Sequence, residues 1–139
     1  MKRSLLLLVA LAVTGCATVK TSVTRPIPKN EPVAVIPDRE LDDWHIQTLL
    51  ISALQERGIR AVDGRDFKQN PPTPVLRYND YWFWDLVPYL RALDVRVIDG
   101  KTNEVMATSS YREGIIHGYP VPRNVVRHIF NGLHEKKAF

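Results

Sequence analysis

The sequence of 139 residues contains one cysteine, Cys16, and only seven glycines. A lone cysteine excludes an intramolecular disulfide, and once it is modified the chain has no thiol for catalysis or for a thiolate metal site. None of the glycines lies in the strand–loop–helix context of a phosphate-binding loop. The fold therefore has to be held together by side-chain packing, and no phosphate-binding loop is predicted.

Long apolar runs are also absent, apart from one near the start. The run from Leu5 to Val13 has nine residues, far fewer than the roughly 20 that span a bilayer. Lys2 and Arg3 precede this run, and small residues follow it. A positive end, an apolar core and a small-residue cleavage site are typical of a bacterial secretory signal.

The segment Val13-Thr14-Gly15-Cys16 resembles the lipobox of bacterial lipoproteins, which reads Leu-(Ala/Ser/Thr)-(Gly/Ala)-Cys. The resemblance implies cleavage between Gly15 and Cys16, a diacylglyceryl thioether on Cys16 and usually N-acylation as well. Two or more acyl chains hold a protein stably on a membrane, where one does not. Residue 17 is alanine rather than the aspartate that retains such proteins at the inner membrane, so the resemblance implies the periplasmic face of the outer membrane. An ordinary secretory signal with a chance cysteine is the alternative.

Composition favours one small domain after this signal. Removal of residues 1–15 leaves about 124 residues, and the formal charge falls from +4 to +2 because Lys2 and Arg3 are lost. No run of basic residues indicates a nucleic-acid partner. Residues 16–32 are rich in threonine and proline and are predicted to form a lipidated tether, although an edge strand within 18–24 is an alternative. Residues 33–139 are predicted to form a single periplasmic domain.

Apolar periodicity within this domain predicts an α+β fold. A stripe at three- and four-residue spacing (Ile46, Leu49, Leu50, Ala53, Leu54) indicates a helix, with Asp38 as its candidate cap. The predicted order is β-α-β-β-β-β-α, a mixed and mostly antiparallel sheet with two amphipathic helices packed on it. The predicted strands are 33–36, 59–62, 75–84, 89–98 and 105–111, and the predicted helices are 39–57 and a closing helix from Pro122. Residues 63–74 are expected to form a loop, and 99–103 a hairpin turn.

The aromatic strand in the middle of the domain is its most distinctive segment. Its residues from Leu76 to Asp85 resemble a group of small proteobacterial outer-membrane lipoproteins that share a Tyr-x-Asp…Trp-x-Trp-Asp segment before a strand and hairpin. The resemblance implies a location and a fold, and it brings no established catalytic residues. Aromatic side chains on both faces of a strand cannot all enter one core, so some are expected to form a contact surface. The predicted surface consists of Tyr78, Tyr81, Trp82, Phe83 and Trp84; the alternative is that Trp82 and Trp84 pack under the helices and the others cover the far face of the sheet.

Candidate reactive groups are few. Asp80 and Asp85 are the residues on which a paired-carboxylate hydrolase would depend. Ser109 or Ser110 with His117 would suggest another hydrolase, but neither serine sits on a nucleophile elbow. The four histidines show no metal-ligand spacing: His45, His117, His128 and His134. We therefore expect no metal, no cofactor and no catalysis.

The sequence as a whole favours a lipid-anchored, non-enzymatic accessory protein of the cell envelope. Its expected partners are the membrane, through the lipid at Cys16, and an envelope protein or peptidoglycan. A binder of small ligands or glycans is the alternative, and a hydrolase is a weaker one.

Overall fold

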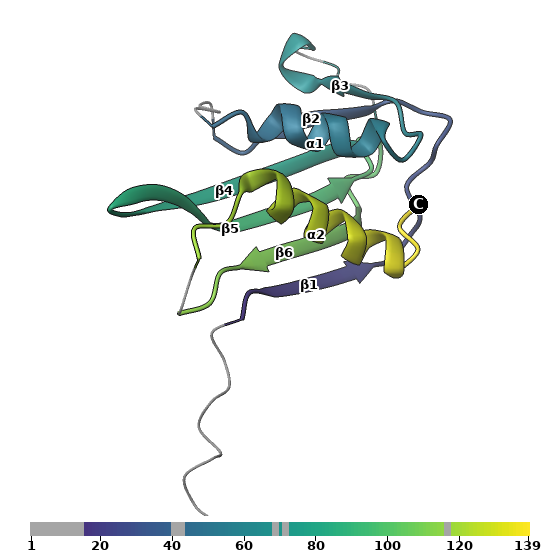
Figure 1. Cartoon of the computed structure of the whole chain (residues 1–139). Helices are drawn as coiled ribbons and strands as arrows, with labels where there is room; N and C mark the ends of the chain where they lie inside the picture. The colour runs from purple at the N-terminus through teal and green to yellow at the C-terminus, as the bar shows by residue number, and fades with distance from the viewer. Residues whose placement is uncertain (1–15, 40–43, 68–69, 71–72, 116–117) are drawn as a thin grey trace, which may run out of the picture.

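The computed structural model describes residues 16–39, 44–67, 70, 73–115 and 118–139. Six strands form one sheet in the order β1-β6-β5-β4-β2-β3, and helices α1 and α2 lie on one face of it (Figure 1). The α+β class and the mixed sheet are confirmed. The bounds are β1 Thr18–Val23, β2 Val33–Pro37, α1 Ile46–Gln55, β3 Ala61–Asp63, the short 3-10 helix η1 Gly64–Asp66, β4 Val75–Asp85, β5 Val87–Ile98, β6 Val105–Arg112 and α2 Pro122–Glu135.

The sheet is mostly antiparallel, as the sequence predicts. β2 pairs in parallel with both β3 and β4, and the remaining neighbours run antiparallel. The predicted β-α-β unit is therefore confirmed in β2, α1 and β3. The β4–β5 pair is a long hairpin with a register shift between Tyr81 and Trp82, and its closed end projects beyond the other strands (Figure 1).

β1 corrects the expected tether. Residues 18–23 pair antiparallel with β6, from Thr18 opposite Arg112 to Val23 opposite Ala107, which makes the observed order β-β-α-β-β-β-β-α. Alternation in this segment places Val19, Thr21 and Val23 on the helix side of the sheet, and β-branched side chains suit a strand. The edge-strand alternative is therefore the correct one for this segment. The proline-rich stretch that follows leads to β2 and buries Ile27 in the core.

α1 is shorter than the sequence predicts. It begins at Ile46, not at residue 39, and residues 40–43 lie outside the described part of the chain. The predicted cap at Asp38 is wrong, because the carboxylate of Asp38 pairs with Arg77 and Arg96 instead. The residue before the helix is His45, whose φ of 57° lies in the left-handed region.

The hydrophobic core fills the space between the helices and one face of the sheet. α2 buries the apolar stripe that the sequence predicts, and Pro122 occupies its first turn. Leu76 and Tyr78 of β4 face this core, together with Leu93 and Val95 of β5. Among the described residues, no helix is long and apolar enough to cross a membrane.

Candidate functional site

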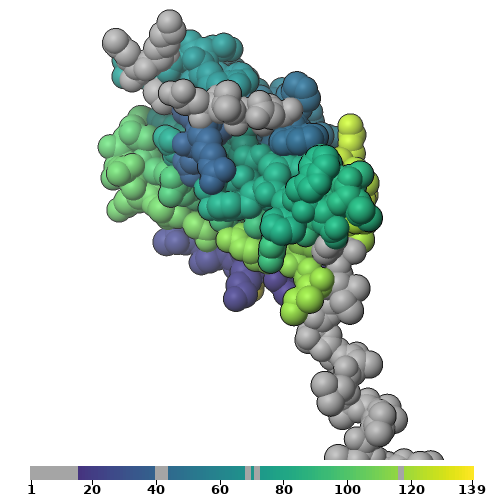
Figure 2. Space-filling view, turned by 90° about the vertical axis from the view of Figure 1, so that its left-hand side faces the viewer, coloured from purple at the N-terminus to yellow at the C-terminus, as the bar shows by residue number. Residues whose placement is uncertain are grey.

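A row of four paired residues crosses the sheet near one of its ends. Thr18 of β1 lies opposite Arg112 of β6, Arg112 lies opposite Ala92 of β5, and Ala92 lies opposite Tyr81 of β4. We call the part of the molecule beyond this row the hairpin end. Of the described residues, it includes 16–17, the end of the β4–β5 hairpin (82–91), and 113–115 and 118–121 between β6 and α2. Figure 2 looks onto the molecule from the side at which the hairpin projects in Figure 1.

The structure divides the predicted aromatic surface between the core and the solvent. Tyr78 is 1% exposed and takes no part in any contact surface. Trp82 is half-buried against the core, and its ring stacks on that of Trp44 at a centroid distance of 4.5 Å. The remaining three predicted residues are exposed: Tyr81, Phe83 and Trp84.

The sheet face opposite the helices, which we call the open face, carries polar and charged side chains. Neither α1 nor α2 packs on it (Figure 1), and the short η1 approaches it only at the β2 edge, where Gly64 lies against the side chain of Ile36. Because successive side chains of a strand alternate between the two faces, the strand pairing places one set of residues there. This set comprises Lys20, Ser22, Arg77, Asn79, Tyr81, Asp94, Arg96, Thr108, Ser110 and Arg112.

Tyr81 lies between two arginines at the junction of the open face and the hairpin end. The guanidinium carbon of Arg39 is 5.5 Å from the centre of its ring, and that of Arg112 is 5.9 Å away. Such cation–π contacts hold the guanidinium groups of both arginines against the Tyr81 ring. Asn79 donates a hydrogen bond from Nδ2 to the Tyr81 hydroxyl at 2.7 Å, which fixes the ring from a third side.

Ion pairs link the strands across the open face. Asp38 accepts hydrogen bonds from Arg77 Nε at 2.7 Å and from Arg96 Nη2 at 3.0 Å. Asp94 accepts two from Arg112, at 2.7 and 2.9 Å, in a two-pronged pair. Partial burial alone would raise the pKa of Asp94, but hydrogen bonds from Arg112 and Ser110, with the Arg112 charge, outweigh it and lower the pKa. The carboxylate therefore stays ionised.

The two candidate catalytic carboxylates do not converge. Asp80 and Asp85 lie five positions apart on β4, on opposite faces, which separates their backbones by about 16 Å. Glycoside hydrolysis needs two carboxyl groups about 5–9.5 Å apart. Asp80 also accepts a hydrogen bond from Trp82 Nε1 at 2.6 Å, so it anchors the indole of that residue.

The other candidate reactive groups are dispersed or engaged in structure. Ser109 is buried and its hydroxyl bonds that of Thr21, while Ser110 hydrogen bonds Asp94 on the open face. His117 lies outside the described residues. Within the described part of the chain, no group of three histidine, cysteine, aspartate or glutamate side chains is placed to hold a metal.

A groove of about 310 Å³ between α1 and α2 contains arginines that the sequence analysis did not single out. Arg57 donates to the carbonyl of Ala53 at 3.0 Å and to Asn131 Oδ1 at 3.3 Å, and it lies over the ring of Phe130. Burial lowers the pKa of Arg57. These contacts use its donors to join the two helices, which is a structural role.

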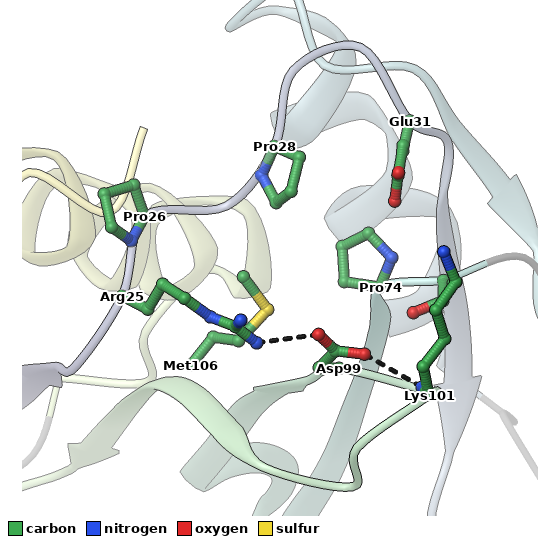
Figure 3. A pocket seen from close by; sticks show the side chains of 9 residues that line it. Arg25, Pro26, Pro28, Glu31, Pro74, Asp99, Lys101 and Met106 are labelled. Atoms are coloured by element: carbon green, nitrogen blue, oxygen red, sulfur yellow. Dashed lines mark hydrogen bonds and ion pairs between the residues drawn. The ribbon is translucent and has the colours of Figure 1, made fainter.

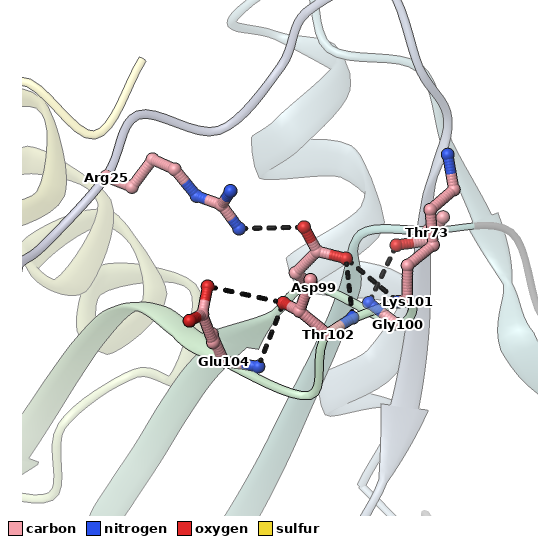
Figure 4. Close-up of polar contacts among 7 residues, drawn as sticks. All are labelled: Arg25, Thr73, Asp99, Gly100, Lys101, Thr102 and Glu104. Atoms are coloured by element: carbon pink, nitrogen blue, oxygen red, sulfur yellow. Dashed lines mark hydrogen bonds and ion pairs between the residues drawn. The ribbon is translucent and has the colours of Figure 1, made fainter.

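The β5–β6 turn, at the opposite end of the sheet, is fastened to two other segments (Figure 4). Asp99 accepts hydrogen bonds from the backbone N–H of Lys101 at 2.8 Å and from Arg25 Nη2 at 2.7 Å. The backbone N–H of Gly100 donates to Thr73 Oγ1 at 2.7 Å. The hydrogen bond from Lys101 and that from Arg25 lower the pKa of Asp99, so the carboxylate stays charged. The sequence predicts the turn but not these long-range contacts.

A pocket of about 160 Å³ lies beside this turn (Figure 3). Pro26, Pro28, Pro74 and Met106 form its apolar part. Asp99, its acidic side chain nearest the turn, is already paired with arginine. Glu31 and Lys101 also line the pocket, which forms where the N-terminal segment crosses the end of the sheet.

Comparison with known proteins shows the fold alone. No family model and no curated protein matches the chain. Two solved structures of the PelC dodecamer from Paraburkholderia phytofirmans, one a single-substitution variant, superpose on it with a TM-score of 0.59. They are 16% and 13% identical to it, and each match covers 84% of this chain and 96% of the PelC chain. The chain is thus similar in fold to PelC from that organism.

Proposed function

We propose that this protein is a lipid-anchored, non-enzymatic accessory protein of the bacterial cell envelope, which binds a protein or cell-wall partner through the open face of its sheet. The lipobox at Val13-Thr14-Gly15-Cys16 supports the anchor, and Ala17 favours the periplasmic face of the outer membrane. The observation that carries the proposal is the open face itself. It is a broad surface of fixed charges and one flanked tyrosine that neither α1 nor α2 covers.

The contacts on this face favour recognition over chemistry. Asp38 and Asp94 are each held by arginines, and Tyr81 is held by Asn79, Arg39 and Arg112. Charged groups kept in fixed positions give an interface its orientation and its discrimination between partners. The sequence suggested the exposed aromatic residues and the proline-rich loop before them as the contact surface; the proposed surface is instead Tyr81 with its charged neighbours.

Among protein partners, further copies of the same chain are the best supported. Both structurally similar PelC structures are dodecamers. In the described chain, β1 and β3 are the outer strands of the sheet, and an outer strand has an edge on which another chain can pair. Light scattering after size-exclusion chromatography of the lipidated protein in detergent measures the number of copies per particle directly. A single copy per particle at all protein concentrations would contradict self-assembly and leave a different partner.

Photo-crosslinking in cells tests the open face. A benzoylphenylalanine residue is placed at Tyr81 or Lys20, both on the open face, and at His128 on the exposed side of α2 as the matched control. We expect an adduct from the first two positions and none from the third. An adduct of twice the chain mass identifies a second copy, while a larger protein or a muropeptide identifies another partner. Equal adducts from all three positions, or none, would contradict the proposal.

A second candidate function, binding of an anionic glycan, is favoured by Arg39, whose guanidinium lies over the ring of Tyr81. Guanidinium groups pair with carboxylate groups of such a chain, and an aromatic ring packs on the apolar face of a sugar. Titration of the protein with muropeptides, followed by tryptophan emission, tests this. Binding that Tyr81→Ala abolishes would support it, whereas an unchanged emission would remove it.

A further inference from the structure

The exposed apolar side chains of this protein concentrate at the hairpin end. Twelve large hydrophobic residues are exposed in the described chain, and seven of them lie beyond the row that runs from Thr18 to Tyr81. They are Phe83, Trp84, Leu86 and Val87 of the hairpin and Ile115, Tyr119 and Val121 of the loop after β6. The opposite end has polar residues around Asp99, with Val105 as its exposed apolar side chain.

The tip of the hairpin carries a residue that its local backbone disfavours. Leu86 has a φ of 57°, in the left-handed region, and its side chain is 83% exposed. Glycine or asparagine suits such a turn better, because a branched side chain is strained there. Neither turn geometry nor burial in the described fold accounts for a leucine at this position. An observed strain of this kind points to a function.

Cys16 projects from the same end of the sheet as this tip. It stands two residues before Thr18, so its α-carbon lies at most about 7 Å beyond the row, whereas Leu86 lies about 16 Å beyond it. The difference, about 9 Å, is comparable to the depth at which apolar side chains enter the interface of a bilayer. Figure 2 shows the hairpin on the face turned to the viewer, and Tyr119 lies against Tyr89 of β5 at a ring-centroid distance of 5.7 Å.

We propose that the hairpin end docks on the bilayer that holds the lipid of Cys16, with Trp84, Leu86 and Val87 inserted into its interface. The proposal rests on the lipidation of Cys16 in the proposed function and specifies how the domain stands on the membrane. Tryptophan and tyrosine are enriched where a protein crosses from water to lipid. Arg91, whose guanidinium lies 5.0 Å from the centre of the Phe83 ring, faces the head groups beside the tip. Asp85, which pairs with Val87 beside the turn, is the one charged side chain of residues 84–87.

A bilayer is the occupant that the geometry favours, because the anchor itself brings this end within reach of the membrane. A docked hairpin directs the strands of the sheet away from the membrane surface. The open face is then roughly perpendicular to the membrane surface and remains accessible to a partner. Docking and partner binding therefore use different surfaces of the domain.

Tryptophan quenching in vesicles tests the docking. The lipidated full chain is reconstituted in vesicles of phosphatidylethanolamine and phosphatidylglycerol, with or without bromine on the acyl chains near the head groups. We expect brominated lipid to quench the emission, Trp84→Phe to remove most of that quenching, and Trp44→Phe to preserve it. Leu86→Asn relieves the strained turn, so it should leave the urea unfolding midpoint unchanged or higher while reducing the quenching of Trp84. If Leu86 served only to stabilise the fold, Leu86→Asn would instead lower the urea unfolding midpoint.

The outcomes distinguish failure of the docking from failure of the lipidation of Cys16 on which it rests. Mass spectrometry that finds Cys16 without lipid overturns the proposed anchor, whatever the quenching. Acylated Cys16 with a Trp84 that bromine does not quench overturns the docking alone. In that case, protection of Trp84 from acrylamide in the water shows that a second copy or another protein covers the tip.

Discussion

The hydroxyl groups of Thr21 and Ser109 hydrogen bond at 2.8 Å across the β1–β6 pair, beneath the backbone of Gly132 in α2. Ser109 is 0% exposed, so this bond satisfies a polar group that water does not reach. The contact also shows that β1 is part of the packed fold. The lipid proposed at Cys16 would consequently be joined to the domain through a hydrogen-bonded strand and not through a loose linker.

Replacement of Gly132 should therefore loosen the packing of α2 on β1. A Cβ atom at this position would lie 2.6 Å from Thr21 Oγ1 and 3.4 Å from a methyl carbon of Val19. Rotation of Thr21 to relieve the clash would break its bond to Ser109. We expect Gly132→Ala to lower the free energy of unfolding by about 1–3 kcal/mol, measured by urea titration. Gly118→Ala is the control, because a Cβ there meets nothing within 4 Å, and equal effects would contradict the packing argument.

Acid should weaken the fold through Asp94. Its pKa is lowered in the folded chain, so the unfolded chain binds more protons as the pH falls below about 4. The stability from its pair with Arg112 is therefore present at neutral pH and lost as the pH falls through the folded pKa. Asp94→Asn should cost about 0.5–1 kcal/mol at pH 7, as expected for a partly exposed pair, and reduce the difference in stability between pH 7 and pH 3. An unchanged difference would show that other carboxylates govern acid unfolding.

Alkali should weaken the fold through Tyr111. Burial, together with its hydrogen bond to the Glu113 carboxylate, raises the pKa of the Tyr111 hydroxyl. The sign is opposite to that of Asp94: the stabilising contribution is complete below the unfolded pKa near 10 and is lost as the pH rises above it. Ultraviolet titration of tyrosinate should find one group that ionises later than the others. Tyr111→Phe should remove that group; a late group that persists in the variant would assign it to another tyrosine.

The regular parts of the fold follow from local pattern. The stripes of α1 and α2, the alternation in β5 and the Asp99 turn each repeat within a few residues, and such short-range periods fix an element whatever its neighbours are. β1 is predicted only as the alternative to a tether, because its alternation is short and is followed by Pro26, Pro28 and Pro32, which indicate an extended linker. Its pairing depends on β6, more than 80 residues away, and on a glycine in α2.

The candidate site was less accessible to sequence reasoning than the elements that form it. The aromatic cluster drew attention to β4, but whether Tyr78 or Tyr81 reaches solvent depends on which face the helices cover. Asp38 illustrates the same limit: before a helical stripe it indicates a cap, yet two arginines from β4 and β5 capture its carboxylate. The useful signal was the polar half of the strand alternation, Arg77, Asn79 and Tyr81 beside Asp94 and Arg96, which marks a face without a core.

Loss of Trp44 should destabilise the base of the hairpin. Its ring stacks on Trp82 at 4.5 Å, and Trp82 in turn is held by the carboxylate of Asp80. Such an aromatic pair contributes about 0.5–1.5 kcal/mol beyond the area that it buries, so Trp44→Ala should lower the unfolding midpoint in urea and shift the emission of Trp82 to longer wavelength. Trp84→Ala is the matched control, because that side chain is 69% exposed and should leave the midpoint unchanged. Were the two variants equally destabilised, the stack would not be what fixes Trp82 against the core.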